Sequence, residues 1–171
     1  TVGLATLTNI KVGTSATIMM TTSNGVGIGT AAPRAELDVT AHTRLKSHSE
    51  EVGIVTVVSN QVNIYLNKAN NFICTVTDNV DRFRIYNADQ TSATSFTLKL
   101  TQDSTGGRNV GIDTMNVGAG GTMPVYWPGG VIPGVTTTAS RTDIYSFKIF
   151  DGADLEGQGI FGVITGQNFL N

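Results

Sequence analysis

The sequence has 171 residues, of which 40% are hydrophobic and only 14% are charged. Eleven basic and thirteen acidic residues give a net charge of −2, and the basic residues are scattered singly. A nucleic-acid partner is therefore not expected, because it needs a dense cationic surface, and no apolar run is long enough for membrane insertion. The sequence begins with Thr1 and not with Met, which fits a processed or partial piece of a longer protein.

The first fifty residues contain no aromatic residue, and Thr, Gly and Ala dominate residues 1–30. Two pieces, Thr1–Thr6 and Gly25–Thr30, are loosely repeated. Such a segment buries too little apolar surface to offset its ordering entropy, so it is either disordered or ordered by neighbouring chains. The short repeat favours the second, an extended, shaft-like β segment over residues 1–50 that is stabilised by other copies. The side chains expected to pack between chains are Val26, Ile28, Leu37 and Val39.

Beyond a boundary near Glu50 and Glu51, apolar and polar residues alternate with a period of two, and the aromatic residues begin. This alternation predicts half-buried strands over residues 62–67, 72–77, 82–86, 96–101 and 145–150. Gly- and Pro-rich turn signals separate them, so we predict an all-β fold with an antiparallel β-sandwich or jelly-roll-like domain over residues 51–171. Its core is expected to draw on Phe72, Val76, Phe83, Ile85, Phe96, Leu98, Leu100, Tyr145, Phe147, Ile149 and Val163.

The stretch Gly25–Val39, GVGIGTAAPRAELDV, resembles a motif common in phage tail-fibre and related virion proteins. The motif has a V-G-I-G-T start, a small residue before Pro, and a Leu-x-Val strand, here Val26–Thr30, Ala32–Pro33 and Leu37–Val39. Residues 60–169 also resemble a β domain of structural proteins from marine and cyanobacterial phages. The matching features are the strand with a Gly-Gly turn at 95–107, the Trp-Pro turn at 125–130, the strand 143–152 and the end 159–169.

This resemblance implies a structural protein of a bacteriophage virion, assembled in the cytoplasm of a bacterial host. The expected role is an oligomeric fibre or appendage that attaches to the host surface, with other virion proteins and a host-surface glycan as partners. A homotrimer is the first expectation, because fibre shafts with weak individual cores usually close that way. The alternatives are a capsid decoration or cement protein without a receptor role and, from another class, a glycan-degrading tailspike fragment.

One departure from the resemblance concerns Arg108–Met123. Related domains tend to run directly from the Gly-Gly turn to the Trp-Pro turn, whereas here a Gly-rich stretch intervenes. We expect this insertion to be a surface loop or an inter-subunit contact.

No cofactor and no metal site is predicted. The glycines of Gly25–Gly29 are followed by Thr30 and lack the βαβ context of a dinucleotide fingerprint. His42 and His48 would share one face of a strand, but the His-x-His arrangement of metal-binding fibres is absent. The acidic clusters at 78–81 and 151–156 lack the spacing of a calcium loop and are interpreted as solvated turns.

The chain is not expected to be an enzyme, because its residues suggest no nucleophile and base, although a carboxylate pair brought together by a sheet stays open. Cys74 lies in an alternating run and is predicted to be a small buried residue, not a reactive thiol. Tyr126 and Trp127 are candidate ligand contacts, because an exposed aromatic face stacks on a sugar ring. The competing and favoured interpretation places Trp127, the only Trp, in the core.

Overall fold

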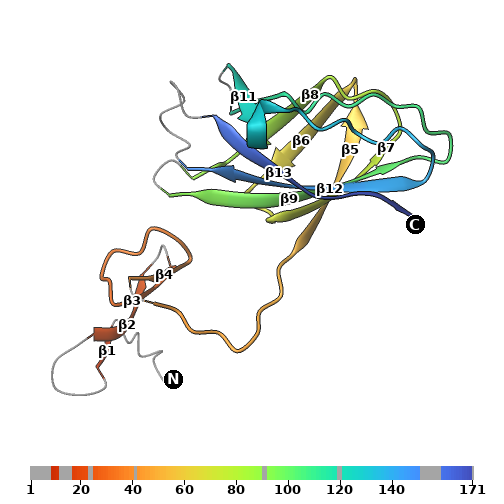
Figure 1. Ribbon diagram of the computed structural model, residues 1–171. Helices are drawn as coiled ribbons and strands as arrows, with labels where there is room; N and C mark the ends of the chain where they lie inside the picture. Colours follow the sequence, from red (N-terminus) through yellow and green to blue (C-terminus); the bar gives the residue numbers. More distant parts are fainter. Residues whose placement is uncertain are drawn as a thin grey trace. The chain divides into compact units, whose positions relative to one another are not determined.

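The structure, a computed structural model, describes residues 9–11, 17–22, 25–40, 42–89, 92–118, 121–150 and 159–170. Within these residues the chain forms strands and one short 3₁₀ turn at Pro128–Gly130, and no α-helix (Figure 1). The predicted all-β fold is therefore confirmed. The chain divides into two compact units, Thr1–His48 and Ser49–Asn171.

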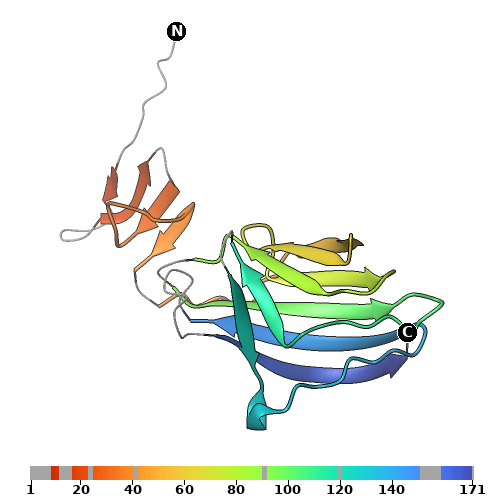
Figure 2. The ribbon, with the colours of Figure 1, turned by 90° about the horizontal axis from the view of Figure 1, so that it is seen from above.

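The first unit contains a four-stranded sheet in the strand order β1-β2-β3-β4 (Figure 2). Strands β1 and β2 pair antiparallel, β2 and β3 pair antiparallel, and β3 and β4 pair parallel. The strands are β1 (Asn9–Lys11), β2 (Thr17–Thr22), β3 (Gly25–Ile28) and β4 (Leu37–Val39). The sheet places the fibre-like motif in β3, β4 and their connection, whereas the repeat at Thr1–Thr6 lies outside the described residues.

The described strands of the second unit close into a barrel in the order β10-β11-β13-β12-β9-β7-β5-β6-β8. Figure 2 shows several of these strands side by side along the barrel wall. The strands are β5 (Val52–Val58), β6 (Gln61–Tyr65), β7 (Asn71–Val76), β8 (Arg82–Tyr86), β9 (Thr94–Gln102), β10 (Thr114–Val117), β11 (Thr122–Tyr126), β12 (Arg141–Ile149) and β13 (Ile160–Leu170).

The predicted antiparallel sandwich is wrong, because the domain is a closed barrel with mixed strand pairing. Strands β5 and β6 form an antiparallel hairpin around Ser59 and Asn60, whose φ angles are +50° and +58°. The next strands then add in parallel on alternate sides, β7 beside β5, β8 beside β6 and β9 beside β7. Period-two alternation reports which face of a strand is buried and not the direction of its neighbour, so sequence alone did not separate the two architectures.

The barrel interior holds the predicted core. Every predicted core residue is at most 3% exposed except Val163, which is 51% exposed. The inward positions of β13 are Ile160, Gly162 and Ile164, so Val163 faces outward. A Cβ atom at Gly162 would lie 2.8 Å from the Trp127 ring, so the missing side chain makes room for the indole.

The stretch Arg108–Met123 contributes strands to the barrel, so the expectation of a surface loop is wrong, whereas the alternative of an inter-subunit contact stays a prediction. Its strand β10 pairs in parallel with β8, and it leads into β11, which pairs in parallel with β13. Met115, Val117 and Met123 are 0%, 5% and 4% exposed. This segment therefore supplies core side chains and joins the two ends of the sheet.

Candidate functional site

The outer face of the barrel carries two hollows where β9 begins, and both are bordered by Ser95, Phe96 and Thr97. We call the first the polar pocket. It has a volume of about 310 Å³ and is lined by Glu50, Asn70, Asn71, Asp89, Ser92, Ala93, Thr94, Ser95, Phe96 and Thr97. We call the second the aromatic groove. It has a volume of about 480 Å³ and is lined by Ser95, Phe96, Thr97, Ser146, Phe147, Lys148, Phe150, Phe161 and Val163.

The register of β7 and β9 places the polar side chains of the pocket. Asn71 is the register partner of Thr97, and the Thr97 amide donates to the Asn70 carbonyl at 2.8 Å. Ser95 and Thr97 point outward because Phe96 and Leu98, between and after them, point into the barrel. The hydroxyl groups of Ser95 and Thr97 and the side-chain amide of Asn71 therefore lie on the same outer surface.

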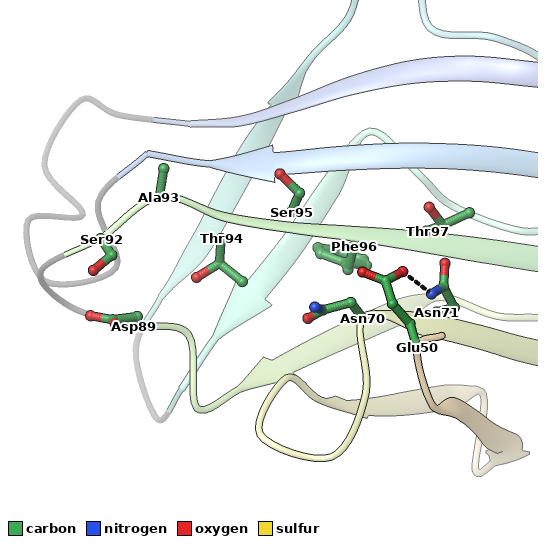
Figure 3. Close-up of a pocket in the computed structure, with 10 residues that line it drawn as sticks. All are labelled: Glu50, Asn70, Asn71, Asp89, Ser92, Ala93, Thr94, Ser95, Phe96 and Thr97. Atoms are coloured by element: carbon green, nitrogen blue, oxygen red, sulfur yellow. Dashed lines mark hydrogen bonds between the residues drawn. The ribbon is translucent and has the colours of Figure 1, made fainter. Parts of the chain in front are cut away.

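Glu50 lies at one end of the pocket and Asp89 at the other, as Figure 3 shows. The Asn71 side-chain amide donates to a Glu50 carboxylate oxygen at 2.7 Å, which holds both side chains in place. Among the described lining residues, these two acids are the only ionisable ones. The arrangement offers acceptors from the acids and both donors and acceptors from amides and hydroxyls, which suits a ligand rich in hydroxyl groups.

The aromatic groove presents apolar side chains to solvent. Phe150 and Phe161 are 53% and 44% exposed, and their rings meet edge to face with centroids 5.6 Å apart. The Lys148 ammonium lies 5.4 Å from the Phe150 ring centroid, within the range of a cation–π contact. The exposed Val163 completes the apolar lining. The groove can therefore hold the apolar side of a ligand beside the polar pocket.

The structure separates the two aromatic residues proposed from sequence as ligand contacts. Tyr126 is 46% exposed, and its ring packs against Phe161 with centroids 5.6 Å apart, so it extends the exposed aromatic surface next to the groove. Trp127 is 6% exposed and packs edge to face on Tyr145 and Phe147 inside the barrel. The interpretation of Trp127 as a ligand contact is therefore wrong. Its ring is buried in the core, as the competing interpretation predicted.

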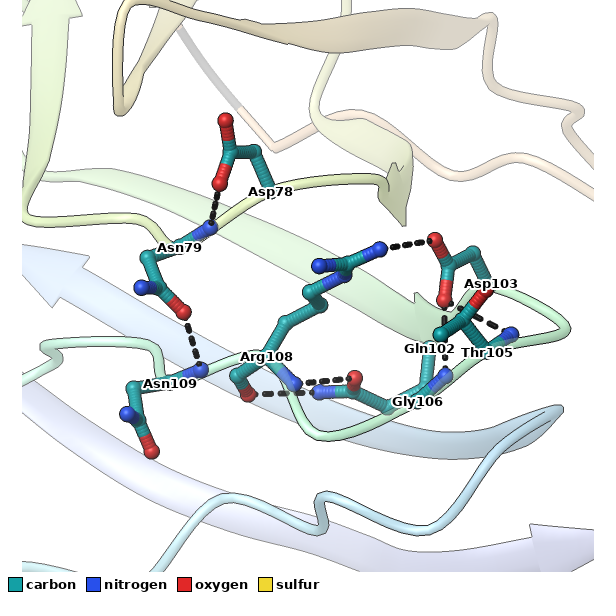
Figure 4. A network of polar contacts seen from close by, with 8 residues as sticks. All are labelled: Asp78, Asn79, Gln102, Asp103, Thr105, Gly106, Arg108 and Asn109. Carbon is teal, nitrogen blue, oxygen red and sulfur yellow. Dashed lines mark hydrogen bonds and ion pairs between the residues drawn. The ribbon is translucent and has the colours of Figure 1, made fainter.

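A network of polar contacts outside these hollows ties neighbouring loops together (Figure 4). The side chain of Gln102 accepts from the Arg108 amide at 3.1 Å and donates to the Arg108 carbonyl at 3.0 Å. Asp103 accepts from the amides of Gly106 and Thr105 and from the Arg108 guanidinium. The Gly106 amide, followed by Arg108, lowers the pKa of Asp103 below its ordinary value. These hydrogen bonds hold the loop after β9 in place, so we interpret Gln102 and Asp103 as structural residues.

The buried carboxylate of Asp143, near the start of β12, forms a second structural cluster of hydrogen bonds. Asp143 is 2% exposed and accepts hydrogen bonds from the amides of Thr136 and Asn168 and from the Tyr145 hydroxyl, at 2.7, 2.9 and 3.1 Å. Burial, reinforced by Asp143, raises the pKa of Tyr145. Since all three donors come from this chain, Asp143 acts in holding the loop before β12 and the end of β13 together.

The residues expected to pack between chains come together in the first unit. Val26 pairs with Leu37 and Ile28 pairs with Val39, so all four aliphatic side chains lie on one face of the β3–β4 pair. Leu37 is 61% exposed and Ile28 is 39% exposed. We call these four residues the aliphatic face. Its packing against other copies stays a prediction.

The other candidate groups named from the sequence are the two histidines, the acidic clusters and Cys74. His42 and His48 are exposed, and the described residues contain no group of three or more His, Cys, Asp or Glu that could hold a metal ion. The acidic cluster at 151–156 lies outside the described residues. Cys74 is fully buried, as predicted, and burial raises its pKa to about 11.

Comparisons with known proteins add no functional assignment. No protein-family model, no curated protein and no solved structure matches this chain. In the part of the chain that the structure describes, no helix is long and apolar enough to cross a membrane. The polar pocket, the aromatic groove and the aliphatic face are therefore the features on which a functional proposal can rest.

Proposed function

We propose that this protein is a structural component of a phage-like virion, a homo-oligomeric and non-enzymatic appendage that contributes to attachment at a host surface. The sequence resemblance of Gly25–Val39 and of residues 60–169 to virion proteins motivates the proposal. Copies associate through the first unit, with a trimer as the expected state, and the barrel presents the attachment surface.

The aliphatic face is the observation that carries the assembly part of the proposal. A sheet is stable when its apolar face is covered by another layer. The described strands of the first unit form a single sheet, and Leu37 on its aliphatic face is 61% exposed. Copies of the same chain can supply a covering layer, because the four side chains of the aliphatic face are uncharged.

The test is the mass of the full chain in solution, measured by light scattering with and without Leu37→Asp. Burying one Leu is worth about 2 kcal/mol in each copy, so a buried charge there disfavours assembly strongly. Leu45→Asp is the matched control, because Leu45 is 63% exposed in the same unit and lies outside the sheet.

We expect the wild-type chain and the Leu45→Asp variant to be oligomeric and the Leu37→Asp variant to approach the 18.0 kDa of one chain. A monomeric wild-type chain contradicts the proposal. Equal masses for wild type and Leu37→Asp show that the aliphatic face is not the interface.

A further inference from the structure

We infer that the polar pocket and the aromatic groove are adjoining subsites for one carbohydrate chain, with an uncharged, hydroxyl-rich sugar in the pocket and an apolar sugar face or N-acetyl methyl group in the groove. The inference deepens the proposed attachment role and rests on it for its biological meaning. The site itself consists of residues of one barrel, so it is testable apart from assembly.

The lining of the polar pocket fits sugar hydroxyl groups. A sugar hydroxyl both donates and accepts, and the pocket offers the acceptors Glu50 and Asp89 together with amides and hydroxyls that do both. The hydrogen bond from Asn71 to Glu50 positions a carboxylate before any ligand arrives. Such preorganisation lowers the entropy cost of binding a small polar ligand.

The charge of the pocket selects against acidic sugars. Among the residues that the structure describes, two carboxyl groups and no Lys, Arg or His line it. An anionic ligand would lie close to like charge, and the repulsion is strongest where protein partly excludes water. Uncharged sugars are therefore preferred over sialylated or phosphorylated ones.

The groove extends the site in the direction of β12 and β13. Ser95 and Thr97 border both hollows, so the hollows adjoin and linked sugar units can occupy both. Phe161, with Phe150 edge-on to it, offers an exposed aromatic face for the C–H side of a ring or a methyl group. Phe161 lies within β13 and Phe150 directly follows β12, so Phe161 is held by a strand of the closed barrel, which favours specific recognition.

The experiment measures binding of defined saccharides to the full chain by saturation-transfer NMR and titration. The probes are the methyl glycosides of glucose, galactose and N-acetylglucosamine, the disaccharide N,N′-diacetylchitobiose, and sialyllactose. The variants are Asn71→Ala and Glu50→Gln in the pocket and Phe161→Ala in the groove. Thr75→Ala is the control, because Thr75 is an exposed residue on the outer face of β7 that lines neither hollow.

We expect at least one neutral saccharide to bind the wild-type chain and the Thr75→Ala variant equally. Each pocket variant should bind that saccharide about tenfold more weakly, since one polar interaction is lost. Phe161→Ala should weaken a disaccharide more than a monosaccharide, which a general loss of folding does not do. Glu50→Gln keeps the side-chain size, so it reports on the site even if Asn71→Ala disturbs the barrel.

Equal affinity of wild type and both pocket variants overturns the inference, as does no binding of any neutral saccharide or tighter binding of sialyllactose. Hydrolysis of a bound saccharide that Glu50→Gln abolishes overturns the non-enzymatic part of the proposed function and not the site. An oligomeric chain that binds none of the saccharides contradicts this inference alone. A monomeric chain that binds them contradicts the proposed assembly alone.

Discussion

Replacing Gly162 with Ala tests the packing that sets the inward face of β13. The added Cβ atom would lie 2.8 Å from two atoms of the Trp127 ring and 2.9 Å from a Val125 methyl carbon. The ring has little freedom to move away, because it packs edge to face against Tyr145 and Phe147 at centroid distances of 6.0 and 5.8 Å. Overpacking of this kind in a close-packed interior is destabilising.

The expected loss in the free energy of unfolding is about 2 kcal/mol, within the range for an added methyl group in a full core. At about 4 °C per kcal/mol for a domain of this size, the melting temperature should fall by about 8 °C. The assay is thermal unfolding followed by circular dichroism, with urea unfolding as a second measure. Gly134→Ala is the control, because a Cβ atom there has no neighbour within 4 Å.

A second substitution separates this clash from a backbone effect. Trp127→Phe is destabilising by itself, but the smaller ring makes room beside residue 162. We therefore expect Gly162→Ala to cost at least about 1 kcal/mol less in the Trp127→Phe background, a coupling typical of residues in contact. Equal melting temperatures for Gly162→Ala and Gly134→Ala, or no coupling with Trp127→Phe, would refute the packing argument.

Two further predictions follow from the titratable groups. Since the folded-state pKa of Asp103 is lowered, its ionised form stabilises the fold above its ordinary pKa of 3.8, and this contribution disappears as the pH falls through the lowered value. Asp103→Asn should thus have a lower free energy of unfolding than wild type at pH 7, measured by urea unfolding. This difference should become smaller below pH 3.8, and a difference that stays constant with pH contradicts the argument. Because burial raises the pKa of Cys74 to about 11, the native thiol should resist a disulfide-exchange reagent at pH 8 and react once urea unfolds the chain, and rapid native labelling would contradict its burial.

The strands were predictable from sequence because their signal is local. Alternation around Phe83 and Ile85, or around Phe96 and Leu98, marks a buried face whatever strand lies beside it. The same signal failed in β13, where the inward position between Ile160 and Ile164 is a glycine and Val163 mimics a core residue. Closure of the barrel could not be predicted either, because β10 is short and lies in a Gly-rich stretch whose sequence is typical of a loop.

The polar pocket was not predictable because its residues are far apart in the chain. Glu50 precedes β5, Asn70 precedes β7, Asn71 begins β7, and Asp89 follows β8. The parallel registers of β5 with β7 and of β7 with β9 bring Glu50, Asn71 and Thr97 close together. Their residue types are those of ordinary loops, so no motif distinguishes them. By contrast, the aliphatic face was foreseeable from Gly25–Val39, where apolar residues alternate at Val26 and Ile28 and again at Leu37 and Val39.

The most direct test of the central claim is electron cryomicroscopy of the virus particle that we propose carries this chain, with an antibody fragment bound to the barrel as a marker. We predict symmetry-related copies at an appendage, grouped in threes, with the antibody fragment bound at that appendage. Copies at regular positions across the capsid lattice would favour a decoration protein and contradict the attachment role. Absence of the chain from purified particles would contradict the proposal as a whole.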